Sequence, residues 1–546
     1  MSIWGTIVSK LKEVLSRMIG RRTIEQTLHL TPVISSQMES AINLWTDMYK
    51  DQAPWLQEPS LENPAKVVSL GLPALIASEK ARMALLEFNS EITAPMQTIE
   101  VENPNYTEPL EGERPSAEPR TYTDLVPIGN TERADFLSEQ YKKLKRQLRK
   151  QLEYGIAKGG LVIKPYVIMP KSNDSDIEAK PEIEFDFIQA DAFFPLSFSA
   201  SGRTITEAAF IQSKVSKDIV YRKLEYHKWE NNVITVINKA FKSTNHTTEG
   251  DMSGIDLGQE VPLSEVSEWA SLQDITTIKN VDRPLFAYFR MPDANTIDTS
   301  SPLGVSGFSR AVRQIREADE QYSRLLWEYE GGELAIDIDR DALKEVQGAD
   351  GMYHTKPNRL QERLFRPVDL GNEDTYQPFA PSLRDSNYID GLNTILMRIE
   401  DICCLSRGSL SDAADIARTA TELKILKQRS YQSNSELQVA IEDTLRDVIY
   451  IMDTYCSLYE ITPAGEYDVN FEWDDSIIVD MDKELEKRIT LMQSGIVSKL
   501  ENRMWYFGET ERQAQEALTK INEEILQSEA NDVATQYFFV NKNDYA

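Results

Sequence analysis

The feature that most constrains the fold of this chain is a mainly helical stretch from 305 to 456 that short strands interrupt once. Apolar residues recur every three or four positions over 305–332 and again over 383–405, which predicts two amphipathic helices. Gly331 and Gly332 favour an end to the first helix at this point. We therefore expect two long helices joined by a small insert.

The insert, 334–381, contains short runs of β-forming residues such as LAIDID and YQPFAP. Two helices that flank a small insert can pack antiparallel and carry the insert at their far tip. We expect such a hairpin here, projecting from the body of the protein. The residues expected to pack the hairpin are Phe308, Val312, Ile315, Tyr322, Leu325, Leu392, Ile395 and Ile399.

A loop and a very long helix follow the hairpin. The segment 407–417 is rich in small residues and predicts a mobile loop. The next segment, 418–456, predicts one helix of about 60 Å, with a polar part at 428–437 where a bend is plausible. A hairpin with many charges buries little surface alone, and it becomes stable if copies of the chain pack side by side in a ring.

The rest of the chain mixes helices and strands, so the expected fold class is α+β. Alternating residues over 160–290 predict antiparallel strands. Helices are expected at 3–19, where the polar face is basic, and at 42–50 and 69–88. Six prolines within 95–130 predict an extended loop, because proline breaks helices.

A further helix is expected around 137–152, and it is strongly basic. Between 142 and 150 the sequence holds six bases and no acid. Such a run is more often a solvated helix face, or a face that meets an acidic neighbour, than a nucleic-acid contact. Both interpretations stay open from the sequence.

The last part of the chain predicts one strand within 457–482, from the residues EYDVNFEW. Helices are expected after it at 483–494, 499–506 and 510–529.

The chain as a whole is acidic, because 59 Lys and Arg against 88 Asp and Glu give a net charge of −29. Such a protein is not a general nucleic-acid binder, so contact with DNA must be local, transient or weakly adhesive. From Arg407 to Ser430, by contrast, five bases oppose three acids. Sparse cations suit a channel through which a duplex slides, because many phosphate contacts would hold the DNA tightly.

Three cysteines lack the spacing of a disulfide framework, and four histidines lack that of a zinc site. We therefore expect a reducing compartment, no metal and no cofactor. No apolar run is long enough to span a membrane, and residues 1–22 lack the apolar centre of a secretory signal.

The sequence lacks the usual enzyme motifs. It has no GxxxxGK[ST] loop for a phosphate, and the segment 303–307 lacks the second glycine of a nucleophile elbow. One acidic cluster could hold Mg²⁺ for phosphodiester cleavage, although acids at a helix N-terminus are the simpler interpretation. The cluster consists of Glu472, Asp474, Asp475, Asp480 and Asp482.

Several segments in a fixed order resemble the portal proteins of tailed phages, in particular those of siphophages that infect Gram-positive bacteria. The most distinctive is 284–337, which begins PLFAYFRMPDANTID and ends WEYEGGELAID. None of the segments is a catalytic signature, and together they touch most of the chain from about 40 to 500. The others lie at 43–55, 69–83, 153–166, 187–198, 418–432 and 471–480.

The resemblance implies a ring, usually of twelve subunits, at one vertex of the phage head. Double-stranded DNA would pass through the ring inward during packaging and outward at ejection. The terminase large subunit would dock first and a head-completion or adaptor protein later, while the major capsid protein and a scaffold protein would be further partners. The protein would be a virion component that assembles in the host cytoplasm, without a membrane contact and without enzyme activity.

In that family a wing surrounds the channel, and a stem of two helices leads to a clip that meets the packaging motor. A loop at the inner end of the stem projects into the channel. The parts implied here are a wing at 1–303, stem helices at 304–333 and 382–406, a clip at 334–381, a channel loop at 407–417, a wing spine helix at 418–456, a wing strand at 457–482 and a crown at 483–546.

The same mapping implies residue roles. The residues expected in the DNA channel loop are Arg407, Gly408, Ser409, Ser411, Asp412 and Asp415. Bases expected on the channel side are Arg418, Lys424, Lys427 and Arg429. The clip residues expected to meet partners are Arg359, Arg363 and Arg366. Two other hypotheses are a metal-dependent nuclease or terminase-like enzyme that uses the acidic cluster, and a minor capsid protein that forms no ring.

Overall fold

The computed structural model of the chain contains two compact units. Both units mix helices and strands, which agrees with the predicted α+β class. The first unit comprises Met1–Leu86, Lys143–Lys171 and Glu182–Thr454, and the second comprises Glu87–Lys142, Ser172–Pro181 and Tyr455–Ala546. The residues that the structure describes are 24–57, 67–86, 88–102, 121–168, 181–199, 204–217, 219–243, 257–339, 345–347, 353–355, 365–368, 376–412, 420–473, 481–508, 514–515 and 517–521.

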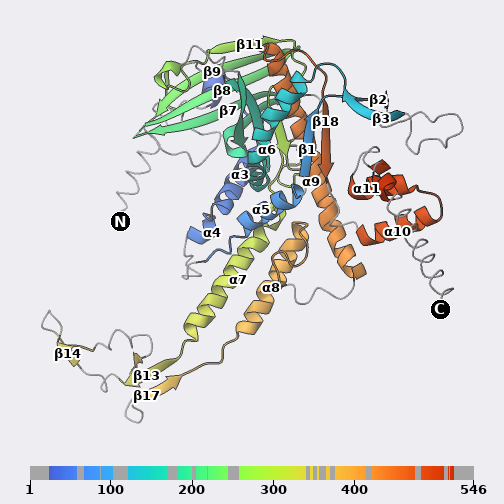
Figure 1. Cartoon of the computed structure of the whole chain (residues 1–546). Helices are drawn as coiled ribbons and strands as arrows, with labels where there is room; N and C mark the ends of the chain where they lie inside the picture. Colours follow the sequence, from blue (N-terminus) through green and yellow to red (C-terminus); the bar gives the residue numbers. More distant parts are fainter. Residues whose placement is uncertain are drawn as a thin grey trace, which may run out of the picture. The chain divides into compact units, whose positions relative to one another are not determined.

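The largest sheet of the first unit is antiparallel, and most neighbouring strands follow one another in the chain (Figure 1). Its order is β10-β9-β8-β7-β6, and β11 also pairs with β9. Asn231 and Asn232 connect β8 to β9 with φ of 52° and 59°, as a two-residue hairpin turn requires. The strands are β6 (Phe193–Phe198), β7 (Ile205–Ser216), β8 (Ile219–Glu230), β9 (Val233–Ser243), β10 (Gln259–Val261) and β11 (Ile275–Lys279).

A second sheet of the first unit has the order β12-β4-β5. Its strands are β4 (Gly160–Ile168), β5 (Glu182–Gln189) and β12 (Ala287–Arg290), so the strands predicted over 160–290 are confirmed. Aromatic side chains join the two sheets, since Phe210 of β7 meets Phe286 edge-on with ring centroids 5.3 Å apart. This packing places the interior of the unit between the sheets.

Helices dominate the N-terminal part of the described chain, and the predicted helix 3–19 lies outside the described residues. The helix expected at 42–50 begins earlier, because Ser35 accepts a hydrogen bond from the backbone N–H of Met38 and caps it. The helices are α2 (Ile24–Leu28), α3 (Ser36–Tyr49), α4 (Pro54–Gln57), α5 (Leu72–Ala84) and α6 (Glu132–Lys158).

Two helices of the first unit, α7 (Val312–Gly331) and α8 (Asp385–Ile402), lie side by side (Figure 1). The predicted helix from 305 starts only at Val312, after the 3-10 turn η3 (Ser309–Ala311). The preceding segment is held by distant backbone groups, because the N–H of Gly307 donates to the carbonyl of Ile156 (2.9 Å).

Gly304 explains why that segment stays extended. A Cβ at this position would lie 2.1 Å from the carbonyl oxygen of Gly159, so only glycine allows the two backbones to approach so closely. The tertiary contact therefore overrides the local helical pattern.

The short strands predicted within 334–381 are confirmed. β13 pairs in parallel with β16 and antiparallel with β17, and β14 pairs antiparallel with β15. The strands are β13 (Ala335–Asp339), β14 (Glu345–Gln347), β15 (Tyr353–Thr355), β16 (Phe365–Val368) and β17 (Tyr376–Phe379). They lie in the chain between α7 and α8, as the hairpin prediction requires.

The long helix predicted at 418–456 is α9 (Ala420–Leu458), a single helix of 39 residues. The helix is continuous through the polar part at 428–437, where a bend was considered.

The second unit contains two pairs of antiparallel strands. β1 (Phe88–Thr93) pairs with β18 (Asp468–Trp473), which is the strand predicted within 457–482. β2 (Met96–Glu102) pairs with β3 (Thr121–Pro127).

The predicted loop at 95–130 is therefore wrong at both ends, where β2 and β3 form a ladder. The loop was predicted from the prolines, although the segment also contains a short run of β-forming residues, QTIEVE. This run pairs across the hairpin with TDLV and its neighbours. Pro127 is tolerated because it lies at the last position of its strand. Residues 103–120 lie outside the described residues.

Two helices follow β18 in the second unit, and both were predicted. They are α10 (Met481–Gln493) and α11 (Lys499–Phe507). Ser498 and Glu501 form a capping box at the start of α11, which explains its sharp beginning. Of the helix predicted at 510–529, residues 514–515 and 517–521 are described and helical.

Candidate functional site

Glu400, near the end of α8, is fully buried and holds the loop that follows the helix. Its Oε1 accepts hydrogen bonds from the backbone N–H groups of Leu410 (2.7 Å) and Ser411 (2.9 Å). Its Oε2 accepts one from the hydroxyl of Ser411 (2.9 Å). A buried carboxylate needs such donors, and the loop supplies three of them.

Two further contacts fix the same loop to α8. The backbone N–H of Asp412 donates to Oδ1 of Asn393 (2.8 Å), and Arg407 pairs with Asp401 (2.6 Å). Gly408 has φ of 85°, which allows the chain to turn between these contacts. The start of the loop is thus tied to the helix at several points.

The predicted mobile loop is therefore fixed over 407–412. Ser411 is buried, Asp412 is exposed, and Arg407, Gly408 and Ser409 are half-buried. Asp415 lies outside the described residues. Of the residues expected to meet DNA, the structure brings the described ones together in one turn.

Sequence reasoning missed Glu400 and Asn393, which do most of this tethering. The only signal was an acid next to Ile399, on the part of the predicted helix that turns toward the interior. Such a signal shows that a carboxylate will need a partner, and it does not show which one.

The predicted basic residues are less well placed. Arg418, Arg359 and Arg363 lie outside the described residues. Lys424, Lys427 and Arg429 lie on α9, and Arg366 lies on β16, but the structure does not describe their side chains. Their proposed contacts stay predictions.

The residues expected to pack the α7–α8 hairpin differ in burial. Four of them, Phe308, Ile315, Leu325 and Ile399, are buried. The half-buried ones are Val312, Tyr322, Leu392 and Ile395.

A charged pair that sequence reasoning missed joins the two helices near the insert. Arg384 donates to Glu328 from Nη2 (2.7 Å) and from Nε (3.1 Å), and its backbone N–H adds a third bond (3.1 Å). These hydrogen bonds lower the pKa of Glu328 below its ordinary value. The two-pronged geometry fixes the direction in which the chain enters α8.

Asp319 of α7 is a second attachment point, and it is 2% exposed. It accepts hydrogen bonds from the indole N–H of Trp55 (3.0 Å) and from the backbone N–H of Leu70 (2.9 Å). Ser323, one turn further, accepts a bond from the backbone N–H of Val68 (2.8 Å). α7 therefore holds α4 and the segment that precedes α5.

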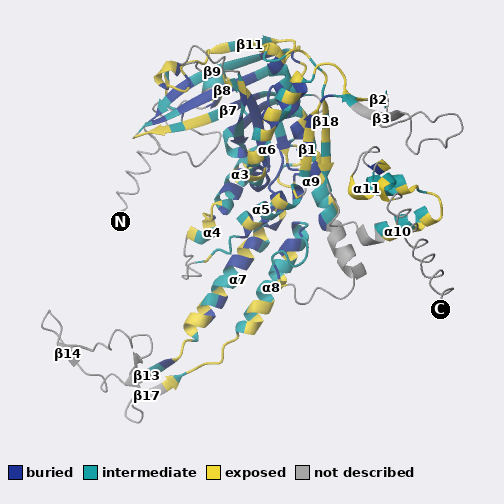
Figure 2. Cartoon of the chain, in the orientation of Figure 1, coloured by how far each residue is buried: buried dark blue, intermediate teal, exposed yellow. Residues whose placement is uncertain are grey.

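The outer parts of α7 and α8, and the residues beside them, expose large apolar side chains. Figure 2 shows exposed bands along both helices. Trp327 and Leu334 are each 60% exposed. The others on this surface are Tyr329, Leu383 and Ile389. These side chains are available for contact with another molecule.

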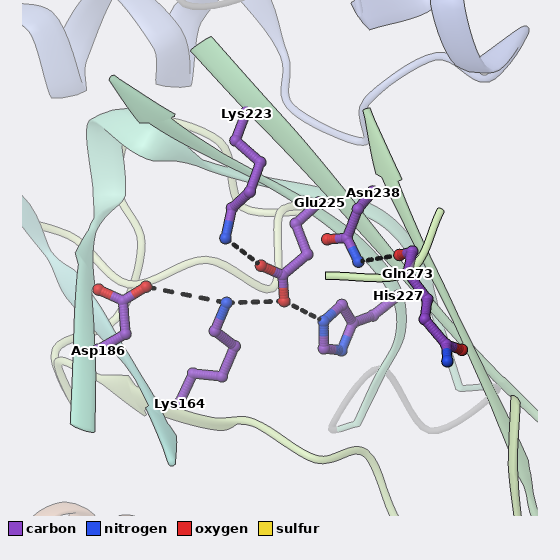
Figure 3. A network of polar contacts seen from close by, with 7 residues as sticks. All are labelled: Lys164, Asp186, Lys223, Glu225, His227, Asn238 and Gln273. Carbon is purple, nitrogen blue, oxygen red and sulfur yellow. Dashed lines mark hydrogen bonds and ion pairs between the residues drawn. The ribbon is translucent and has the colours of Figure 1, made fainter. Parts of the chain in front are cut away.

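A buried polar network joins the two sheets of the first unit (Figure 3). Glu225 of β8 accepts a hydrogen bond from Lys164 of β4 (2.7 Å) and pairs with Lys223 (3.1 Å). It also meets Nε2 of His227 (2.7 Å). All four side chains are buried, so their charges need partners. Asp186 of β5, 3.8 Å from Lys164, supplies a second carboxylate for the two lysines.

The electrostatics of the network fix its protonation. Burial alone would raise the pKa of Glu225, but Lys164, His227 and Lys223 outweigh it and hold this pKa well below its ordinary value. Burial lowers the pKa of His227 more than its bond to Glu225 raises it. The network therefore contains an ionised Glu225 and a neutral His227. Its ion pair between Lys164 and Glu225 connects the two sheets.

The acidic cluster considered for a metal-dependent enzyme is only partly described. Glu472 lies on β18, where the side chain of Asn470 donates to it (2.9 Å). Asp474, Asp475 and Asp480 lie outside the described residues, and the side chain of Asp482 is not described. Within the described part of the chain, no three His, Cys, Asp or Glu residues are grouped as metal ligands. No described helix is both long and apolar enough to cross a bilayer.

Comparison with protein families places the chain among the phage portal proteins. It matches the family model described as phage portal protein, SPP1 Gp6-like, over residues 128–529. Because the match covers more than half of the chain, the chain belongs to this family. As a member, it is a virion component that serves DNA packaging. No curated protein matches the chain.

Proposed function

We propose that the protein works as a closed ring, of about twelve subunits, that forms the DNA channel at one vertex of the phage head. The observation that carries this proposal is the exposed apolar surface of the hairpin, led by Trp327 and Ile389. A single chain leaves this surface in water, and a neighbouring copy related by rotation would cover it.

The α7–α8 hairpin is the stem in this proposal, and the strands between 334 and 381 are the clip. The wing comprises 1–303 together with the spine helix and strand at 418–482, and the crown lies within 483–546. The terminase large subunit docks at the clip during packaging, through the arginines Arg359, Arg363 and Arg366. The head-completion or adaptor protein docks there later. The major capsid protein and a scaffold protein are further partners of the ring.

The channel loop in this proposal is 407–417. Its tethered start supports a role that needs a fixed position, because Glu400 and Asn393 hold 410–412 on α8. A loop that projects from a fixed base keeps its tip at one radius of the channel while the duplex slides past. The bases Arg418, Lys424, Lys427 and Arg429 stand behind it and add weak attraction for phosphates.

Native mass spectrometry of the purified chain tests the proposal. A closed ring of about a dozen copies, with a central bore wide enough for B-form DNA by cryo-electron microscopy, is the expected result. Single chains, open polymers or a ring without a bore would contradict it and would favour the minor capsid protein.

A further inference from the structure

The exposed face of α6 carries positive charge that the function above does not use. In a chain with 88 acids and 59 bases, the nine residues 142–150 contain six bases and no acid. Arg146, Arg149 and Lys150 are exposed on the part of this helix that belongs to the first unit. Figure 2 shows the exposed bands of α6.

These three cations lack an acidic partner within the described part of the chain. Lys143, one turn before, pairs with Glu182 (2.6 Å), and Arg149 reaches only the hydroxyl of Ser78 on α5 (3.5 Å). On α5 itself, Glu79 already pairs with Arg82 (2.8 Å). The next acid along α6, Glu153, accepts a hydrogen bond from the hydroxyl of Tyr49 (2.7 Å). Within the described part of the chain, no ion pair therefore neutralises these three cations.

On other helices of the same unit, surface bases form ion pairs with acids of the same helix. On α7 and α9, bases and acids stand four residues apart and form ion pairs, as Arg313 does with Glu317 (3.0 Å) and Arg446 with Glu442 (2.7 Å). α6 instead places Lys150 four residues after Arg146, and like charges at this spacing oppose helix formation. The apolar side, with Leu144, Leu148 and Leu152 buried, keeps the helix in place.

We propose that Arg146, Arg149 and Lys150 bind the phosphate backbone of duplex DNA on the outside of the ring, separately from the channel. This inference rests on the proposed ring. A protein partner would need carboxylates matched to the three cations, whereas duplex DNA offers one charge per about 1.7 Å of its axis in any register. Contacts from an exposed helix face reach phosphates and not base edges, so binding is independent of sequence.

Three contacts per chain bind weakly, and a ring multiplies them. Copies that rotational symmetry repeats around the ring engage one long duplex together, so that the later contacts form at high effective concentration. The rest of the chain is acidic and repels DNA, which confines the duplex to this face.

A closed circular plasmid tests the inference, because a circle has no end to thread through a channel. Gel-shift titration at 50 and 200 mM NaCl should show binding by the wild-type ring that weakens as salt rises. Arg146→Glu with Lys150→Glu should lower the affinity at 50 mM NaCl by about tenfold or more, and should make the salt dependence shallower, because each lost phosphate contact removes about 0.9 from the slope.

The matched control is Lys217→Glu with Lys279→Glu, which changes two exposed bases by the same total charge, one in the turn after β7 and one on β11. It should bind the plasmid like the wild type. Equal loss in both double variants, or no binding by the wild type, would overturn the proposal. So would a normal plasmid affinity together with a loss of rings from the α6 variant, since the face would then contact a second copy.

Native mass spectrometry on the same samples separates this inference from the proposed function. If the wild type forms rings that do not bind the circle, the α6 inference fails and the portal ring stands. If the wild type forms no rings, the proposed function fails, and with it the outside surface on which this inference depends.

Discussion

Glu400 is the side chain on which the loop after α8 most depends. Alanine at this position would leave two backbone N–H groups and one hydroxyl without their acceptor, and each orphaned buried group costs about 1–3 kcal/mol. We expect Glu400→Ala to lower the free energy of unfolding by about 2 kcal/mol or more, measured by urea denaturation. Glu400→Gln keeps one oxygen acceptor and should lose less.

The control for Glu400 is Glu330→Ala, which removes an exposed acid from α7. It should change the free energy of unfolding by less than about 0.5 kcal/mol. If Glu400→Ala and Glu330→Ala unfold at the same urea concentration, the carboxylate does not hold the loop.

His227 makes the stability of the first unit depend on pH. Its pKa lies below the ordinary value because the ring is buried, while in the unfolded chain it titrates near pH 6.5. Below that pH the unfolded state binds the proton first, so stability is full above pH 6.5 and falls as the pH drops toward the native pKa. His227→Gln should flatten the decline of the free energy of unfolding between pH 7 and pH 5.

Glu225 does not contribute to that window, because its carboxyl stays ionised in both states above pH 5. The control variant is His29→Asn, which replaces an exposed histidine with a residue that tolerates its positive φ of 55°. It should keep the wild-type pH profile. An unchanged profile in His227→Gln would show that this histidine is not the titrating group.

Among the elements, α7 is the helix to which α4 and the segment that precedes α5 are attached, and Asp319 accepts two of the hydrogen bonds that attach them. Burial raises the pKa of Asp319, so its charge is costly there, while its oxygen atoms serve as acceptors for Leu70 and Trp55. Asp319→Asn removes the costly charge and keeps one oxygen acceptor for the backbone N–H of Leu70, so it should lose only the bond from Trp55. Asp319→Ala should speed hydrogen exchange of the amides in 67–72 by about tenfold, measured by mass spectrometry.

The two substitutions at Asp319 control each other, because they remove the same charge and differ in the acceptor. Equal protection of 67–72 in both variants would mean that Asp319 does not attach this segment to α7.

The helices and strands also show which structural features the sequence alone predicts. The periodicity of α7, α8 and α9 is local, and so is the alternation of the strands over 160–290, so these were predicted. The start of α7 at Val312 was not, because it is set by the contact of Gly307 with Ile156. The tethering by Glu400 was missed for the same reason: a carboxylate does not indicate which backbone groups the fold will bring to it.

At the scale of the whole molecule, the family supplies the function, and the exposed apolar side chains of the hairpin support the proposed ring. The α7–α8 hairpin leaves Trp327 and Ile389 exposed to water in the single chain. Packing of one copy against the next would remove this surface from water around the whole circle. In the proposed ring, these exposed residues would stabilise the contact between neighbouring copies.

Charge placed on the exposed side of the α7–α8 hairpin should abolish the proposed ring. Trp327→Glu with Ile389→Glu changes one exposed residue on each helix of the hairpin, so each chain should fold with an unchanged circular dichroism spectrum. The ring should be lost, because its interface would bury unpaired carboxylates in every copy. Native mass spectrometry should then show single chains, while Trp327→Phe with Ile389→Leu, which keeps the surface apolar, should still form rings. Rings in the glutamate variant would place the subunit interface elsewhere on the chain.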